Sequence, residues 1–295
     1  MDFLSLLEEK KVLLFDGSLG TELMRRGLKK GTLPDIWNLE KPDIIKDVFK
    51  QYFLAGSDIV QTATFQANGI ALKKHGIDAI DELNKASAEI LRSICPENAC
   101  IIGDIGPSGE FLPPVGNASV NELKYGYKMQ VRALEDYIDA YHLETFSDLQ
   151  EMTIAINAVK NESKKPIIAS MTYKKTPRGF FTIMGNSLTE CINKSIELGV
   201  SVIGSNCTMG SKEFIELAKG IRDITSNFPI SIKPNAGQPE LINGIPVYKQ
   251  KPEDFAEDFK EILECGVQII GGCCGTGPSH IRLLRKELDN YIQRR

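Results

Sequence analysis

Histidine and tryptophan are scarce in this chain, whose 295 residues include three His and one Trp. His75, His142 and His280 lie far apart in the sequence, and none has a neighbour at the spacing of metal ligands. We interpret all three as structural or surface residues. The chain also contains no C-x-x-C pair, the unit from which structural zinc sites are usually built. Neither a histidine-rich metal site nor a zinc knuckle is therefore expected.

Long apolar runs and a strong charge of one sign are also missing. No apolar run could span a bilayer, and the first residues include Glu8, Glu9, Lys10 and Lys11 where a secretory signal would be apolar. The net charge is −4, with acids and bases interspersed, which argues against a nucleic-acid partner. We expect a cytoplasmic protein without a membrane partner. Thiols stay reduced there, so the seven cysteines indicate metal binding, catalysis or core packing.

Short apolar runs alternate with helical patterns along the whole chain. The apolar runs cover residues 12–15, 58–62, 100–104, 140–144, 166–171, 201–204, 230–233 and 267–270. The helical patterns cover 43–55, 80–93, 122–138, 148–162, 188–198, 212–224, 253–264 and 279–292. This alternation predicts an α/β fold, a (β/α)8 TIM barrel, with a doubly wound open sheet as the alternative. No linker divides the chain, so we expect a single domain over residues 1–295.

Polar and small residues follow nearly every predicted strand. They include Asp16, Gly17, Ser18, Gly20, Thr62, Thr64, Asp104, Glu144, Thr145, Asn206, Cys207, Asn235, Cys273 and Cys274. Parallel barrel strands all end at one face, and active sites of such barrels form there. The sequence therefore predicts that these residues converge on one mouth.

The adjacent pair Cys273-Cys274 lies between Gly271-Gly272 and Gly275. Glycines on both sides leave room for another group near both sulfurs, which favours a soft metal, although two small core residues would fit as well. Cys207 follows the sixth predicted strand and is the obvious third thiolate. Three thiolates and an open fourth position are typical of a catalytic zinc site.

A zinc ion held by three thiolates has a formal charge of −1, which makes it a poor Lewis acid for hydrolysis. Such an ion suits the binding of a fourth thiol, which loses its proton on coordination. A free thiol has a pKa of about 8.5 and is mostly protonated at neutral pH. The predicted chemistry is transfer of an alkyl group to sulfur.

Asp16 and Glu144 are the carboxylates most suited to a role at the mouth. They could act as general acid and base, or hold the ammonium group of an amino acid, and each could instead cap a helix or form a turn. The backbone amides of Gly17, Ser18 and Gly20 could bind a carboxylate. Asp104 precedes a Gly-Pro turn and is interpreted as structural.

Six motifs give the chain a resemblance to a known family. They are residues 16–21 (DGSLGT), 103–107 (GDIGP), 144–149 (ETFSDL), 204–207 (GSNC), 234–237 (PNAG) and 271–275 (GGCCG). The chain resembles the homocysteine S-methyltransferase family, and within it the homocysteine-binding module of cobalamin-dependent methionine synthase. The resemblance implies zinc on Cys207, Cys273 and Cys274. It also implies that Asp16 and Glu144 hold the ammonium group of homocysteine, and that amides near Gly17 and Ser18 hold its carboxylate.

The methyl donor is the part of the reaction that the resemblance leaves open. The chain ends about where the barrel closes, so we expect the donor to arrive from outside, as a methyl-corrinoid protein on a separate chain. The alternatives are a small donor such as S-methylmethionine or a betaine, a thiol-binding subunit without turnover, and a hydrolase that uses Asp16 and Glu144. The basic and aromatic segment 173–186 is unlike the usual family loop.

Overall fold

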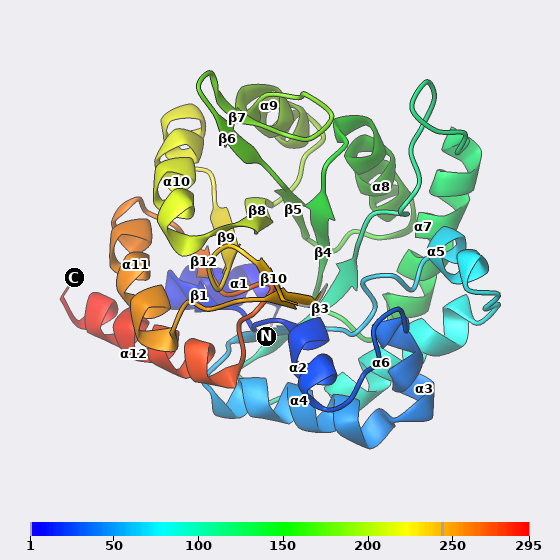
Figure 1. Cartoon of the computed structure of the whole chain (residues 1–295), viewed down its shortest axis with the longest axis horizontal. Helices are drawn as coiled ribbons and strands as arrows, with labels where there is room; N and C mark the ends of the chain where they lie inside the picture. Colours follow the sequence, from blue (N-terminus) through cyan, green and yellow to red (C-terminus); the bar gives the residue numbers. More distant parts are fainter. Residues whose placement is uncertain (1, 243–244, 295) are drawn as a thin grey trace.

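Eight parallel strands occupy the centre of the molecule and helices surround them (Figure 1). The computed structural model describes residues 2–242 and 245–294. The barrel strands are β1 (Leu13–Leu14), β2 (Ile59–Gln61), β3 (Cys100–Ile105), β4 (Ala140–Phe146), β5 (Ile167–Met171), β8 (Val202–Gly210), β9 (Ile230–Asn235) and β12 (Ile269–Ile270). They pair in the order β1-β12-β9-β8-β5-β4-β3-β2. The predicted barrel and its eight strands are confirmed.

The helices form an outer layer and also cover one end of the barrel. They are α1 (Phe3–Lys10), α2 (Leu19–Arg25), the 3-10 helix η1 (Pro34–Ile36), α3 (Trp37–Glu40), α4 (Pro42–Leu54), α5 (Gly69–Lys74), α6 (Ile80–Arg92), α7 (Val120–Leu134), α8 (Leu149–Glu162), α9 (Leu188–Glu197), α10 (Ser211–Thr225), α11 (Pro252–Glu264) and α12 (Pro278–Gln293). The eight longest helices after α1 match the predicted ones. Sequence periodicity missed α2, α3 and α5 because each spans two turns or fewer.

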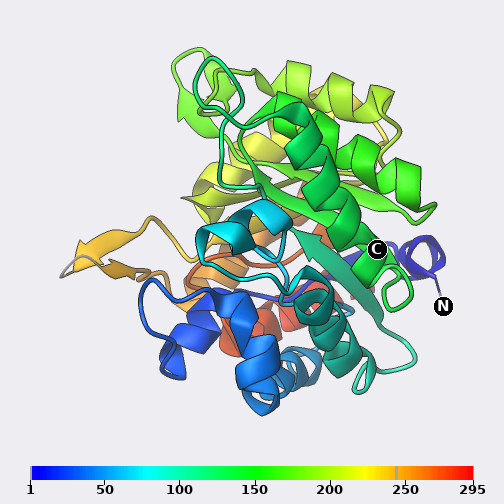
Figure 2. The same cartoon turned by 90° about the vertical axis from the view of Figure 1, so that its right-hand side faces the viewer.

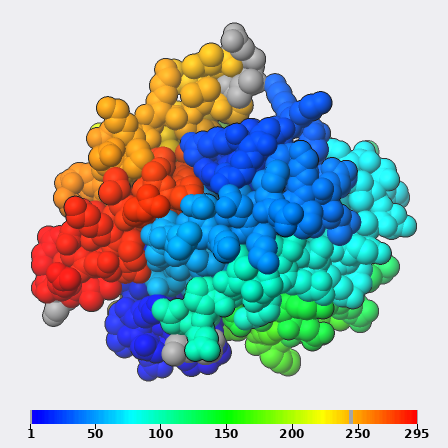
Figure 3. Space-filling view, turned by 90° about the horizontal axis from the view of Figure 1, so that it is seen from below, coloured from blue at the N-terminus to red at the C-terminus, as the bar shows by residue number. Residues whose placement is uncertain are grey.

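Asp58 closes the barrel between β1 and β2, the two strands at the ends of the pairing order. Its backbone N–H donates to the carbonyl of Leu14 (2.7 Å), and its carboxylate accepts from the N–H of Leu14 (2.8 Å). Lys10 and Arg285 donate to the same carboxylate at 2.6 and 3.0 Å. Outside this junction, α4 and α12 pack side by side, as the view from below shows (Figure 3). Hydrogen bonds from Asp58 therefore take the place of direct backbone pairing between β1 and β2.

Alternation along the strands divides the apolar side chains between two cores. One core lies between the strands and the surrounding helices, and the other lies inside the barrel. The interior core is Phe3, Leu6, Leu7, Leu13, Phe15, Ile59, Cys100, Ile102, Ala140, Ile168, Val202 and Ile269. Its first three members come from α1, whose apolar face plugs the end at which the strands begin. The barrel is therefore a filled core with one open mouth, at the end where the strands finish.

Two hairpins project from the mouth of the barrel, at the end opposite α1 (Figure 2). One consists of β6 (Lys174–Thr176) and β7 (Gly179–Phe181), and the other of β10 (Glu240–Ile242) and β11 (Ile245–Val247). The segment 173–186, interpreted above as a loop, therefore contains an antiparallel pair. Sequence reasoning missed both hairpins, because three-residue strands are too short to establish an alternating pattern.

Candidate active site

Three thiols meet on the wall of a cavity of about 270 Å³ at the barrel mouth. Cys207 lies in β8, whereas Cys273 and Cys274 follow β12, and their sulfur atoms all lie within 4.8 Å of one another. The Sγ atoms of Cys207 and Cys274 are 3.9 Å apart, far beyond the roughly 2 Å of a disulfide. The predicted convergence of these three cysteines is what the structure shows.

Left-handed backbone conformations place Cys207 at the mouth. Cys207 and Thr208 have φ angles of 61° and 60°, which non-glycine residues adopt only at a cost. The register between β8 and β9 shifts in the same stretch. Thr208 stabilises the turn because its hydroxyl donates to the carbonyl of Tyr173 at 2.8 Å. Non-glycine backbone strain at this point is a sign of a functional site that the sequence does not reveal.

The three thiols share negative charge unequally. Hydrogen bonds from Cys273 and Cys274 lower the pKa of Cys207 to about 3. The negative sulfur of Cys207 in turn raises the pKa of Cys274 to about 12 and moves that of Cys273 in the same direction. The sulfur of Cys207 is therefore a thiolate that accepts hydrogen bonds from the thiols of Cys273 and Cys274. A soft cation is the ligand that would let all three ionise.

The cluster fits a metal ion on a second ground. Oδ1 of Asn235, at the end of β9, is buried without a hydrogen-bond partner in the described residues. The side chain of the same residue hydrogen-bonds Cys207 and contributes to its lowered pKa. A buried oxygen with an unused lone pair, on a side chain that hydrogen-bonds Cys207, is a further acceptor next to that cysteine.

A buried ion pair lies beneath the sulfur cluster. Nζ of Lys233 is 3.0 Å from Oδ1 of Asp16 and 2.9 Å from Oε1 of Gln61, and it stands 3.9 Å from the centre of the Phe15 ring. Lys233 is 2% exposed. Burial by itself would lower the pKa of Lys233, but the carboxylates of Asp16 and Glu144 outweigh it and raise that pKa. The floor of the site therefore holds a permanent cation.

Gln61 connects every polar group of this floor. Its Nε2 donates to Oδ2 of Asp104 and to Oε1 of Glu144, both at 3.1 Å. Its Oε1 must then be an acceptor, which makes Nδ1 of His142 (3.1 Å) a donor. Nε2 of His142 accepts from Ser170 at 2.8 Å. Burial, with Lys233 nearby, lowers the pKa of His142, so its ring is neutral.

The carboxyl residues predicted for substrate binding occupy different positions. Glu144 lines the cavity and accepts from Nδ2 of Asn206 at 3.2 Å. Asp16 lies behind Lys233 and is not among the residues that line the cavity. Burial raises the pKa of Asp16, with Lys233 opposing that shift, and burial raises the pKa of Glu144 as well. Gln61 donates to both acids, but only Glu144 lines the cavity, and their predicted role in holding an ammonium group stays a prediction.

The turn from Gly17 to Gly20 borders the same cavity. The N–H of Ser18 already donates to the hydroxyl of Thr276 at 3.2 Å, and its side chain caps α2 by accepting from the N–H of Thr21. A Cβ on Gly17 would lie 2.9 Å from the hydroxyl of Thr276 and 3.0 Å from the ring of Tyr52, so only glycine fits there. The predicted carboxylate subsite at Gly17 and Ser18 stays a prediction.

Sequence reasoning assigned no role to Gln61 or Lys233 and interpreted His142 and Asp104 as structural. Gln61, His142 and Lys233 lie inside strands, where a single polar residue in an apolar run was the only available signal. Asp104, interpreted above as structural, lines the cavity. His280 accepts from the N–H of Gly277 at the start of α12, as a capping residue does.

A second group of residues has the composition of a metal site. Ligand atoms of Asp104, His142 and Glu144 lie within 4.8 Å of one another, and all three residues are buried. Both ring nitrogens of His142 already have hydrogen-bond partners, as described above, and Lys233 adds a positive charge nearby. The sulfur cluster is therefore the better metal site of the two.

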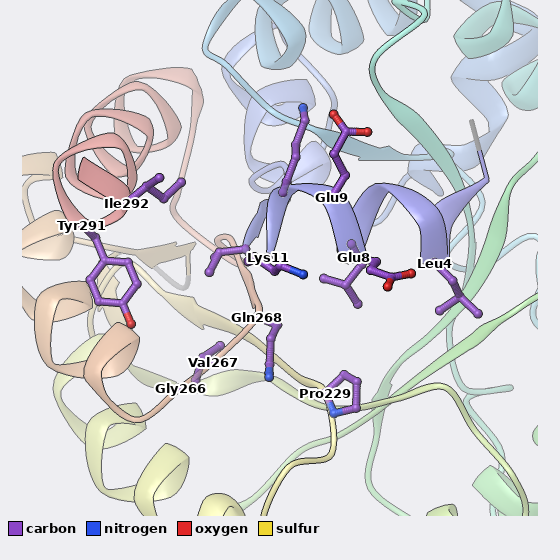
Figure 4. Close-up of a pocket in the computed structure, with 13 residues that line it drawn as sticks. Leu4, Glu8, Glu9, Lys11, Pro229, Gly266, Val267, Gln268, Tyr291 and Ile292 are labelled. Carbon is purple, nitrogen blue, oxygen red and sulfur yellow. The ribbon is translucent and has the colours of Figure 1, made fainter. Parts of the chain in front are cut away.

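A larger hollow of about 750 Å³ lies at the opposite end of the barrel (Figure 4). Residues of α1 such as Leu4 and Glu8 line it, together with Pro229, Gln268 and Tyr291. It contains none of the cysteines and no buried ion pair. The mouth with the three thiols is therefore the candidate active site despite its smaller volume.

One protein family matches almost the whole chain. The model of the homocysteine S-methyltransferase family matches residues 13–288. The chain belongs to this family. The match confirms the resemblance seen in the six motifs.

Individual relatives of the family are similar over nearly the whole chain. Methionine synthases of Mycobacterium tuberculosis and Mycobacterium leprae are each 30% identical over 95% and 92% of the chain. The chain spans only about a quarter of their length, 25% and 24%. Among solved structures, the metallated form of the homocysteine methyltransferase MmuM from Escherichia coli has a TM-score of 0.79 at 23% identity, covering 96% of this chain and 98% of that one. This structural likeness shows the shared fold.

Among the helices of residues 2–242 and 245–294, none has the length and apolar character needed to cross a membrane.

Proposed function

We propose that the chain transfers a methyl group to the sulfur of homocysteine and so forms methionine. The observation that supports this most is the meeting of three thiols and the carboxyl of Glu144 on one cavity wall. The thiols suit a soft metal that binds a substrate sulfur, and the carboxyl suits the ammonium group of an amino acid. The family assignment and the names of the relatives agree with this substrate.

Cys207, Cys273 and Cys274 are the residues that would hold a zinc ion. A bound zinc ion would lower the pKa of a substrate thiol and so favour its thiolate at neutral pH. Asn206 orients the surrounding groups, because its Nδ2 donates to Oε2 of Glu144 (3.2 Å) and to Sγ of Cys273 (3.8 Å). The sulfur cluster, which would bind the thiol of the substrate, therefore lies next to Glu144, which would bind its ammonium group.

The reaction needs no general base at the methyl-transfer step. The thiol of homocysteine releases its proton before the transfer. Its sulfur then attacks the methyl carbon in line with the bond to the donor. That bond breaks with its electron pair on the donor, and the products are a thioether and the demethylated donor. The cavity wall acts by positioning the amino acid so that its sulfur faces the open mouth.

The proposed donor is a methyl-corrinoid protein on a separate chain. The 30% identity to methionine synthases over most of this chain supports it. Both hairpins project from the mouth (Figure 2), the side from which a donor protein would approach. A small donor such as S-methylmethionine or a betaine remains the alternative, and a thiol-binding subunit without turnover is a second one.

A donor panel tests this proposal. The chain is incubated with homocysteine and one donor at a time (methylcobalamin-loaded corrinoid protein, S-methylmethionine or a betaine), and methionine is measured. We expect methionine only with the corrinoid protein. Turnover with a small donor would favour an autonomous enzyme, and no turnover with tight thiol binding would favour the binding subunit.

The variant in which Cys207, Cys273 and Cys274 are all changed to Ser is the matched control. It should lose bound zinc and all methionine formation. Full activity of the wild-type chain without tightly bound zinc would contradict the proposal. Activity that survives in the triple variant would point to the two carboxylates instead.

A further inference from the structure

The sulfur cluster contains three possible methyl acceptors besides the substrate. A zinc ion held by Cys207, Cys273 and Cys274 would have three thiolates of the protein around it and, with substrate bound, a fourth sulfur beside them. Each of these sulfurs is a nucleophile towards an electrophilic methyl group. The site therefore needs a feature that directs the methyl group to the substrate and away from the chain.

Methylation of a metal-binding cysteine would damage the site. In this competing step the thiolate of Cys274, for example, forms a new bond to the methyl carbon. The bond from that carbon to the donor breaks with its electron pair on the donor, and the cysteine becomes a neutral thioether. Because the thiolate is the form of cysteine that holds the metal, one misdirected transfer would weaken metal binding.

Tyr248 contacts the cluster from the end of β11, at the base of the β10–β11 hairpin. Its ring lies against Gly275, where an added Cβ would clash with it. From this position its side chain hydrogen-bonds that of Cys274. Burial and the charge of Cys274 raise the pKa of Tyr248, so its hydroxyl keeps its proton and is the donor. Cys274 therefore accepts a hydrogen bond from outside the cluster.

The other two sulfurs also have donors that are not cysteines. Nδ2 of Asn206, which is completely buried, donates to Sγ of Cys273 at 3.8 Å. The backbone N–H of Thr208 donates to Cys207 within the left-handed turn described above, and the side chain of Asn235 makes a further hydrogen bond to the same cysteine. Each of the three sulfurs is therefore hydrogen-bonded by a separate group of the barrel mouth.

A hydrogen bond makes a thiolate less reactive. It stabilises the negative charge and makes the sulfur less basic, and the nucleophilicity of a thiolate falls with its basicity. The wall of the cavity also includes Leu19, Ala63 and Phe65, whose side chains have no hydrogen-bond donor. A substrate sulfur in contact with this part of the wall would keep its full nucleophilicity.

We propose that hydrogen bonds from Tyr248, Asn206 and Thr208 protect the three cysteines from methylation, so that the methyl group goes to the substrate. Tyr248 is a positioning residue, because it acts through Cys274 and does not line the cavity. The inference rests on the proposed function, which brings the zinc ion and the electrophilic methyl group to this site.

Alkylation resolved by site tests this protection. The zinc-loaded chain is treated with iodoacetamide, whose carbon forms a bond to sulfur as iodide leaves, and mass spectrometry measures the rate at each cysteine. Tyr248→Phe keeps the ring against Gly275 but removes the O–H, so alkylation of Cys274 alone should become about three- to tenfold faster. Tyr125→Phe, at an exposed position of α7, is the matched control and should leave every rate unchanged.

A cobalt(II)-loaded chain separates the effect of the hydrogen bond from simple shielding of the sulfur. Removing a donor from a thiolate raises the energy of its lone pair, so the sulfur-to-cobalt charge-transfer band of Tyr248→Phe should move to longer wavelength. A band at the wild-type position together with faster alkylation would mean that the hydroxyl only shields Cys274, and would overturn the inference.

The remaining outcomes separate this inference from the proposed function. Unchanged alkylation of Cys274 in Tyr248→Phe overturns the inference alone, provided that the wild-type chain forms methionine with the corrinoid protein. Faster alkylation of all three cysteines with loss of zinc also overturns it, because Tyr248 would then hold the metal site together. A wild-type chain that retains no zinc overturns both ideas. If Tyr248→Phe does not fold, Asn206→Leu must show the same acceleration at Cys273 alone, or the inference fails.

Discussion

Nζ of Lys233 lies 3.0 Å from Oδ1 of Asp16, although 217 residues separate the two in sequence. Both side chains are almost completely buried. The pair connects the end of β1, the first barrel strand, to β9, the seventh, and forms the floor on which the polar groups of the site rest. Its removal should affect the stability of the barrel as well as its chemistry.

Lys233→Met should destabilise the protein by about 3–5 kcal/mol, because it leaves Asp16 as an uncompensated buried acid. Urea unfolding measures the loss. Lys175→Met is the matched control: Lys175 pairs with Glu216 at the surface, and removing that pair should cost about 1 kcal/mol or less. The double variant Asp16→Asn with Lys233→Met should recover part of the lost stability. Equal effects of the two lysine changes would contradict the buried ion pair.

Cys207→Ser should reduce bound zinc from about one equivalent to a small fraction, because two thiolates hold the ion less tightly than three. Metal analysis of the purified protein measures this. Cys265→Ser is the control, since Cys265 lies just after α11, outside the cluster, and its thiol contacts the carbonyl of Glu261. Retention of a full equivalent by Cys207→Ser would rule out Cys207 as a ligand.

Gly275→Ala should destabilise the chain and disturb the metal site together. Gly275 has φ +83°, and an added Cβ would lie 2.3 Å from Cβ of Tyr248, so backbone strain and a clash act at once. We expect a loss of about 2–4 kcal/mol by urea unfolding, with weaker zinc retention.

Gly76→Ala is the matched comparison for this change. Gly76 has a similar φ of +69°, but no atom of residues 2–242 or 245–294 lies within 4 Å of the added Cβ. Backbone strain alone should lower the free energy of unfolding by about 1 kcal/mol, and the zinc content should stay normal. If Gly275→Ala and Gly76→Ala lowered the free energy of unfolding equally, the clash with Tyr248 would not contribute to the loss.

Asp35 should make the protein less stable as the pH rises from about 4 to 7. Burial raises the pKa of this carboxyl to about 7, whereas an unfolded chain has it near 3.8. Between these values the folded state binds more protons than the unfolded state, so the free energy of unfolding falls with increasing pH. Asp35→Asn should flatten this dependence, measured by urea unfolding at pH 4.5, 6 and 7.5. A wild-type curve parallel to that of the variant would show that Asp35 titrates normally.

Sequence reasoning was most successful where the signal was local. Eight short apolar runs placed every barrel strand, because a strand buried on both faces must be apolar along its length. Cys273 and Cys274 were recognisable from their adjacency and their glycines. Cys207 could be added because parallel strands end at one face. Short elements such as α2 and the β10–β11 hairpin gave no such pattern.

Asp104 and Lys233 show where local reasoning stops. A lone polar residue at the end of an apolar run is compatible with a turn, a cap or a buried network, and only the neighbours decide which. Those neighbours are distant in sequence: Gln61 reaches Asp104 across 43 residues and Lys233 across 172. The sequence could therefore name the acids near the mouth but could not say which of them faces the cavity.

By itself, the sequence determined the barrel, the family and the three candidate thiols, since apolar periodicity and adjacent cysteines are properties of neighbouring residues. Only the tertiary structure decided how the charges are distributed. It buries Asp16 behind Lys233, leaves an oxygen of Asp104 without a partner among the described residues, and brings Sγ of Cys207 to within 3.9 Å of Sγ of Cys274. The physical reason is that burial and pairing are set by chain closure around the barrel, which places side chains from distant strands in contact.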